Sequence, residues 1–157
     1  MTARFIERSR FIEKMSVPGT LGAGLWLLVY ASTPAALVAA LFLGLFPAGA
    51  RPDIAPFTWL VVSPVIETLM LGAILIHLLK RHKEHHAILL AALVLAAFHS
   101  LNAMLWGVSA LPLFIVHGYA FTRLYEVGRQ RAFAVPMLAH ALHNGLALLA
   151  LKLLKVL

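Results

Sequence analysis

Five long apolar runs, separated by short charged or turn-forming segments, dominate this 157-residue sequence. A helix needs roughly 20 apolar residues to cross the hydrocarbon core of a bilayer, and in lipid the backbone must satisfy its own hydrogen bonds. The sequence therefore predicts an all-α integral membrane bundle of about five transmembrane helices. The runs cover residues 20–46, 56–79, 86–106, 111–125 and 133–151.

The composition excludes several classes of protein. The chain is 62% apolar and only 12% charged, which is outside the range of soluble domains. It contains no cysteine, which excludes a disulfide framework, a thiolate nucleophile and a cysteine zinc site. Any catalysis must therefore use Glu, His, Asn, Ser or Thr.

The breaks between the runs contain turn-forming residues. They fall at Pro18–Gly19, at residues 47–53, at residues 80–86, at Gly107 with Pro112, and at residues 128–131. No break is long enough to separate two domains. We expect residues 1–157 to form a single membrane domain, in which the fourth run is short for a crossing.

The positive charges predict an orientation. The net charge is +7, but the basic residues lie between apolar runs and form no stripe with aromatic residues, so we expect no nucleic-acid partner. If the runs cross the membrane in turn, most basic residues share one side, which the positive-inside rule makes cytoplasmic. The N-terminus is then cytoplasmic, beside an anionic leaflet, and the C-terminus is outside. The cytoplasmic set is Arg4, Arg8, Arg10, Lys14, Lys80, Arg81, Lys83, Arg123, Arg129 and Arg131, and the opposite set is Arg51, Lys152 and Lys155.

Residues 1–17 form an amphipathic cytoplasmic segment with a short repeat, residues 4–8 followed by residues 10–14. Its mixture of charge and large apolar groups favours a helix in the plane of the membrane interface. A solvated tail that only supplies positive charge is the alternative.

Glu67 is the only acidic residue inside an apolar run, and three other polar residues lie at a similar expected depth. With a rise of about 1.5 Å per residue, Glu67, His99 and Asn144 each lie roughly 19 Å from the basic boundary of their runs. His140 lies one turn from Asn144 on the same helix face. Ionisable groups at this depth usually face a protein interior or a water-filled cavity and serve a function.

These groups offer the chemistry of peptide hydrolysis. Glu67 can act as the general base that deprotonates a water molecule, with His99 sharing that water or protonating the leaving amine. His140 and Asn144 can donate hydrogen bonds to the oxyanion of the tetrahedral intermediate. Residues expected around this set are Ser63, Asn102 and His117.

Two alternatives stay open at this point. The polar groups could serve only as interhelical hydrogen bonds, which in membranes contribute roughly 0.6 to 2 kcal/mol each. Glu67, His99 and His140 could also bind a metal, although the sequence contains no His-Glu-x-x-His segment. We expect no metal and no cofactor.

The three motifs, in their order, resemble those of the CPBP family, also called the ABI or CAAX-protease-like family, of glutamic intramembrane peptidases. That family has Glu-Glu-x-x-x-Arg, then Phe-x-x-x-His, then His-x-x-x-Asn on successive membrane helices. Residues 64–72, 95–99 and 140–144 are similar to these motifs, and the similarity extends over roughly residues 60–150, a CPBP-like catalytic core. It implies that Glu67 activates water with His99, and that His140 and Asn144 hold the oxyanion.

Three positions depart from the family pattern: Thr68 replaces the second Glu, Gly72 replaces the Arg, and Leu95 replaces the Phe. Thr68 joins the residues expected around the site, and the changes concern substrate recognition and the orientation of Glu67. The resemblance implies a metal-independent intramembrane endopeptidase in a bacterial inner membrane, acting on a membrane-anchored protein or peptide. Prenyl-protein cleavage is less expected than peptide processing.

The alternative function is a non-catalytic membrane scaffold or a bacteriocin-immunity-type protein of the same fold. A proton-coupled carrier that uses Glu67 is weaker still, because five short spans give little sign of an inverted repeat. An enzyme needs Glu67 and His99 within reach of one water molecule, whereas a scaffold would bury them fully hydrogen-bonded.

Overall fold

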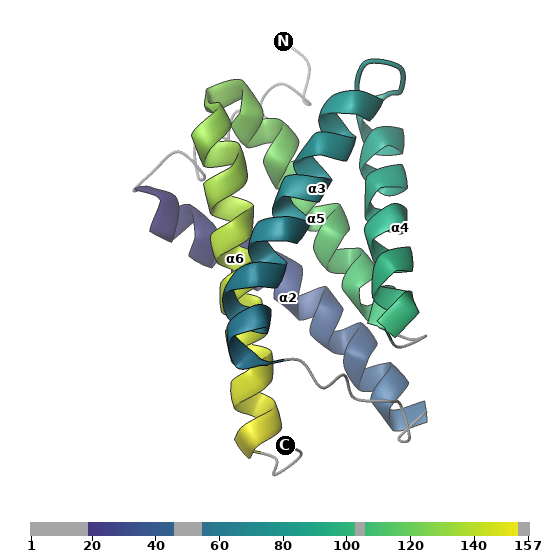
Figure 1. The fold of residues 1–157 in the computed structure, drawn as a ribbon, viewed down its shortest axis with the longest axis vertical. Helices are drawn as coiled ribbons and strands as arrows, with labels where there is room; N and C mark the ends of the chain where they lie inside the picture. Colours follow the sequence, from purple (N-terminus) through teal and green to yellow (C-terminus); the bar gives the residue numbers. More distant parts are fainter. Residues whose placement is uncertain (1–18, 46–54, 103–105, 154–157) are drawn as a thin grey trace.

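The computed structural model describes residues 19–45, 55–102 and 106–153, and within them the chain is an all-α bundle (Figure 1). Its elements are α2 (Gly19–Leu45), the π-helix η1 (Thr58–Val62), α3 (Ser63–Leu78), α4 (Glu84–Asn102), α5 (Trp106–Val127) and α6 (Arg129–Leu153). Five α-helices match the five predicted runs. The predicted interfacial segment, residues 1–17, lies outside the described residues.

The helices after η1 alternate in direction. The α3–α4 turn and the α5–α6 turn lie at the same end of the bundle, and α6 returns beside α3 toward the other end (Figure 1). Lys80, Arg81 and Lys83 lie in the first of these turns, and Arg129 and Arg131 lie at the start of α6, just after the second. The order of the helices is therefore consistent with the predicted alternation of crossings.

Three stretches of the described chain are long and apolar enough to cross a membrane: Thr58–Leu78, Glu84–Leu101 and Arg129–Leu149. In α2, the apolar stretch Gly22–Leu37 is shorter. The protein is an integral membrane protein, and the crossings by α2 and α5 remain predictions from the sequence.

One predicted break is wrong. Gly107 and Pro112 lie inside α5, so the fourth run is a helix of 22 residues, and Trp106, expected in the third run, begins α5. Proline is tolerated within helices of membrane proteins because neighbouring groups re-satisfy the freed carbonyl, and Pro34 in α2 and Pro136 in α6 are further cases. The break before α5 therefore cannot be located from proline and glycine alone.

Small side chains allow the helices to pack closely. Alanines on α2, α4, α5 and α6 are almost completely buried, and larger apolar groups such as Phe114 and Leu75 fill the spaces between them. Between membrane helices, small interfacial residues permit the close approach that van der Waals packing requires. This packing fixes the helices that contribute polar groups to the interior. The buried alanines include Ala23, Ala31, Ala87, Ala91, Ala92, Ala120, Ala132 and Ala139.

Candidate active site

Glu67 on α3 lies against two imidazole rings from two other helices. Its Oε2 atom is 3.4 Å from Nε2 of His99 on α4 and 3.5 Å from Nε2 of His140 on α6. The His140 side chain is 4% exposed, whereas those of Glu67 and His99 are 16% and 21% exposed. The structure thus brings together three of the four residues predicted to be catalytic, and leaves two of them accessible.

The hydrogen bond of His99 fixes its tautomer. Its Nδ1 atom lies 3.0 Å from the Leu95 carbonyl oxygen one turn earlier. Because a carbonyl oxygen can only accept, Nδ1 carries a proton, and Nε2 of the neutral ring is an acceptor. Nε2 of His99 faces Oε2 of Glu67. Since both are acceptors, they form a direct hydrogen bond only if a proton lies between them.

The Glu67 carboxyl group is only partly satisfied. The Ser63 hydroxyl, one turn earlier on α3, donates a hydrogen bond to it. Oε2 is buried and has no hydrogen-bond partner among the described residues, and the two imidazole distances are long for direct hydrogen bonds. Oε2 therefore has hydrogen-bonding capacity that the described side chains do not use, which is unusual for a buried oxygen.

Asn144 is held by a backbone carbonyl on the π-helix η1. Its Nδ2 donates a hydrogen bond of 2.8 Å to the Trp59 carbonyl oxygen. That carbonyl has no donor in its own helix, because the Ser63 N–H goes to Thr58 and the next residue, Pro64, has no N–H. The bond fixes the amide one turn of α6 beyond His140, and one of its N–H groups remains free for another acceptor.

His117 on α5 is completely enclosed beside His140. Its side chain is 1% exposed, and the centroids of the two rings are 5.7 Å apart. Its Nε2 has no hydrogen-bond partner within the described part of the chain. This expected neighbour of the site therefore lies beside the imidazole of His140.

Phe114, which the sequence did not single out, packs against both histidines that face Glu67. Its buried ring lies 5.1 Å from the His99 ring and 6.0 Å from the His140 ring, in edge-on contacts with both. The residue lies one turn before His117 on α5. Phe114 could have been identified from the sequence only with the correct register of α5, and the predicted start of that helix was wrong.

The remaining predicted residues have different outcomes. Thr68 is buried on α3, on the face that packs into the bundle, and Leu95 is buried on α4. The side chain of Asn102 lies outside what the structure describes. Two aromatic rings close the space at Gly72, because an added Cβ there would lie 2.5 Å from Cε1 of Phe133 and 2.8 Å from Cε2 of Phe121.

His143 joins α6 to α2 instead of pointing to Glu67. Its Nδ1 lies 2.8 Å from the Ser32 hydroxyl oxygen. A link between residues so far apart in the sequence could not be derived from the spacing of one helix. It tethers the helix that carries His140 and Asn144.

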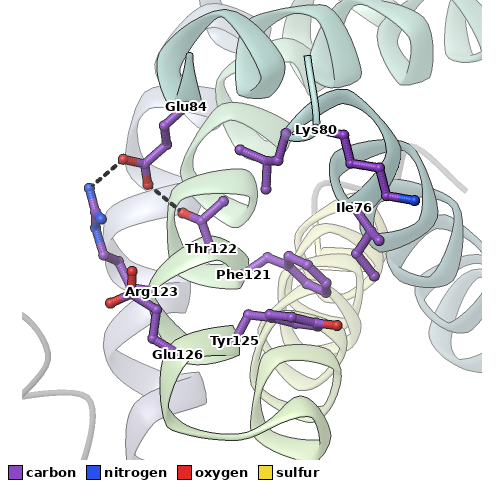
Figure 2. Close-up of a pocket in the computed structure, with 9 residues that line it drawn as sticks. Ile76, Lys80, Glu84, Phe121, Thr122, Arg123, Tyr125 and Glu126 are labelled. Carbon is purple, nitrogen blue, oxygen red and sulfur yellow. Dashed lines mark hydrogen bonds and ion pairs between the residues drawn. The ribbon is translucent and has the colours of Figure 1, made fainter. Parts of the chain in front are cut away.

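A cavity of about 440 Å³ lies elsewhere, at the end of the bundle that carries the α3–α4 turn (Figure 2). Glu67 is not among its lining residues. Across residues 19–45, 55–102 and 106–153, no three His, Asp or Glu side chains are grouped so that they could hold a metal ion.

Comparison with known families decides the relationship of the chain. Residues 49–146 match the model of the family described as type II CAAX prenyl endopeptidase Rce1-like. The chain belongs to this Rce1-like family. The match includes all three motifs and supports a CAAX-protease-like membrane peptidase as the general class. Comparison with curated proteins and with solved structures finds no significant match.

Proposed function

We propose that this Rce1-like protein is a metal-independent glutamic intramembrane endopeptidase that cleaves a membrane-anchored protein or peptide. The observation that carries the proposal is the position of one Glu67 oxygen within 3.5 Å of two imidazole nitrogens from different helices. A carboxylate at this depth is costly unless it has a task. The partial exposure of Glu67 and His99 favours a site over a closed packing contact.

The proposed reaction begins with one proton shared between Glu67 and His99. When the shared proton is on Nε2 of His99, the Glu67 carboxylate takes a second proton from a water molecule. At the same time the water oxygen bonds to the carbonyl carbon of the peptide, whose C–O π electrons become an oxyanion, and the pair then holds two protons. When the tetrahedral intermediate collapses, the C–N bond breaks and the nitrogen takes one proton from the Glu67–His99 pair. The products are a carboxylic acid and an amine, and the pair returns to its starting state.

His140 and Asn144 are proposed to hold the oxyanion. The Trp59 carbonyl fixes the Asn144 amide plane, so its second N–H is oriented before the reaction begins. His117 is proposed to be a positioning residue. Its ring lies beside that of His140 and limits the orientations of the His140 ring. Preorganised donors of this kind contribute about 100-fold to 1,000-fold in kcat.

The substrate is proposed to reach Glu67 from the bilayer. Ile66 and Phe98, the neighbours of Glu67 and His99, are half exposed on the outer surface of the bundle. An apolar anchor could lie against these groups while its peptide bond approaches the carboxylate. The proposed location is a bacterial inner membrane, with residues 1–157 acting as one membrane domain and the N-terminus in the cytoplasm.

The test is a comparison of wild type, Glu67→Gln and the matched control Glu84→Gln, whose carboxylate lies at the α4 start, away from the site. New peptide termini in membranes of cells expressing each variant identify the cleaved substrate, and cleavage is then measured with purified protein in liposomes. We expect Glu67→Gln to lower the rate at least about 100-fold and Glu84→Gln to leave it within a few-fold. Full activity of Glu67→Gln would refute the proposal.

Metal independence is tested in the same liposome assay. Because the proposed reaction uses only protein side chains and water, EDTA and 1,10-phenanthroline are expected to leave the rate unchanged. Loss of activity with chelator and its return with added Zn²⁺ would instead assign a metal to Glu67, His99 and His140.

A non-catalytic scaffold or immunity role is the second candidate, and the aromatic packing at Gly72 favours it. The CPBP pattern has Arg at this position, but here the two rings leave no room for a longer side chain. If the protein is a scaffold, Glu67→Gln should bind its membrane partner as wild type does, and no new peptide termini should depend on Glu67.

A further inference from the structure

The cavity at the α3–α4 end has an apolar floor and a charged rim (Figure 2). Ile76 on α3, Leu79 just after it and Phe121 on α5 supply the apolar surface. The charged side chains of the lining are two cations and two carboxylates, Lys80, Arg123, Glu84 and Glu126. Its volume of about 440 Å³ is in the range of small-molecule sites. No step of the proposed hydrolysis uses it.

The carboxylate of Glu84 does not pair with Lys80. Glu84 accepts a hydrogen bond of 2.8 Å from the Thr122 hydroxyl and one of 2.9 Å from the Arg123 guanidinium. In Figure 2 the Lys80 ammonium points away from that group, and Lys80 has no ion pair within the described chain. A second cation, Arg129, lies 5.9 Å from the Tyr125 ring centroid.

The cavity lies where the chain passes between two membrane-spanning stretches. Thr58–Leu78 ends just before Lys80, and Glu84–Leu101 begins just after it. The rim is therefore at the level of lipid headgroups, while Ile76 and Phe121 face the level of the acyl chains. A free cation above an apolar floor at this depth matches a molecule with a phosphate at one end and a hydrocarbon chain at the other.

We propose that this cavity binds a membrane glycerophospholipid, with its phosphodiester on Lys80 and the upper part of an acyl chain on Ile76 and Phe121. Arg129 lies over the Tyr125 ring and outside the lining of the cavity. Lys80 lies two residues after the end of α3, the helix that carries Glu67, so a lipid bound here would fix the depth of α3 and of its carboxylate.

The experiment measures lipid binding to the purified full chain in detergent by native mass spectrometry. The probes are dioleoyl phosphatidylglycerol, dioleoyl phosphatidylethanolamine and dioleoylglycerol, which lacks phosphate. Both phospholipids are expected to bind more tightly than dioleoylglycerol, and a preference between them would report the contribution of the rest of the headgroup. Inorganic phosphate at millimolar concentration is expected not to displace the lipid.

Three variants locate the site. Lys80→Gln is expected to raise the Kd of both phospholipids about fivefold, whereas the control Lys83→Gln, in the same turn but outside the lining, changes it less than twofold. Ile76→Trp fills the cavity and is expected to abolish binding while the helical circular dichroism is kept. If Ile76→Trp does not fold, the comparison of Lys80→Gln with Lys83→Gln decides.

Several results would overturn the proposal. Equal binding of dioleoylglycerol would show that the phosphate is not recognised, and displacement by inorganic phosphate would show that no lipid chain is required. Equal effects of Lys80→Gln and Lys83→Gln would indicate attraction by the general positive charge of this end. A co-purifying peptide that occupies the site and excludes phospholipid would assign the cavity to a different partner.

Discussion

The side chain of Asn144 on α6 donates a hydrogen bond to the Trp59 carbonyl, which has no donor within η1. The Trp59 carbonyl lacks an intrahelical partner because the π-turn takes the Ser63 N–H and Pro64 has none. In a membrane interior an unsatisfied carbonyl is costly. Asn144 therefore has a structural function in addition to its proposed contact with the oxyanion.

This dual function predicts a specific coupling. Asn144→Ala is expected to lower the free energy of unfolding by about 1 kcal/mol, because interhelical hydrogen bonds in membranes are worth that order. In a Pro64→Ala background the new N–H can donate to Trp59, so the loss caused by Asn144→Ala should shrink. A double-mutant cycle with unfolding in mixed micelles measures the coupling, and strict additivity would contradict it.

The proposed catalytic loss of Asn144→Ala should not be rescued by Pro64→Ala. The new backbone donor can restore stability, but it cannot supply the N–H directed at an oxyanion. The liposome cleavage assay separates the two effects of Asn144. Recovery of activity along with stability would assign Asn144 to folding alone.

Close approach of α4 and α5 requires a residue without a side chain at Gly107. A Cβ at this position would overlap the Ala96 carbonyl oxygen and the Ser100 hydroxyl. Because one obstacle is backbone, it cannot rotate away, and α5 would have to move from α4. The packing of Phe114 against His99 depends on the same helix pair.

Gly107→Ala is accordingly expected to destabilise the protein by roughly 1 to 3 kcal/mol, the usual cost of overpacking. Gly128→Ala is the matched control, since nothing lies within 4 Å of a Cβ added there. Thermal unfolding in detergent, followed by circular dichroism, compares the two variants. Equal melting temperatures for both would show that α4 and α5 can separate without cost.

Element boundaries were predictable where charge and apolarity change together. Helix α6 follows the basic turn that the sequence marked. Helix α2 begins at Gly19, whose φ of 78° is favourable for glycine because it has no Cβ. The start of α5 was missed because Gly107 and Pro112 are turn formers in soluble proteins but lie inside a helix here. Packing against neighbouring helices makes glycine and proline tolerable within α5, and a local sequence pattern carries no information about that packing.

The proximity of the candidate site residues was predictable from the sequence, and their contacts only partly so. Depth along each run placed Glu67 and His99 together, since a constant rise per residue converts sequence distance into height. Depth gives no information on lateral contacts, so the roles of Trp59, Phe114 and Ser32 could not be foreseen. Each depends on how two helices are rotated against each other.

The orientation of the whole protein in the membrane can be tested by labelling single introduced cysteines, because the chain has no cysteine of its own to react. His82→Cys in the α3–α4 turn is expected to react with a membrane-impermeant maleimide only after the cells are permeabilised. Arg51→Cys, which the sequence assigns to the other side, should react in intact cells. Labelling of both variants in intact cells would contradict the predicted five crossings.

The two aromatic rings over Gly72 also constrain how this chain could have diverged from its relatives. An arginine at that position needs Phe121 and Phe133 to shrink or move, and Phe121 also forms the floor of the lipid-sized cavity. The first carbon of such a side chain would already meet both rings, so Gly72→Arg alone is expected to disturb the packing of α3 against α5 and α6. Members that carry the arginine and this one should therefore differ at several positions together, with intermediates that fold poorly.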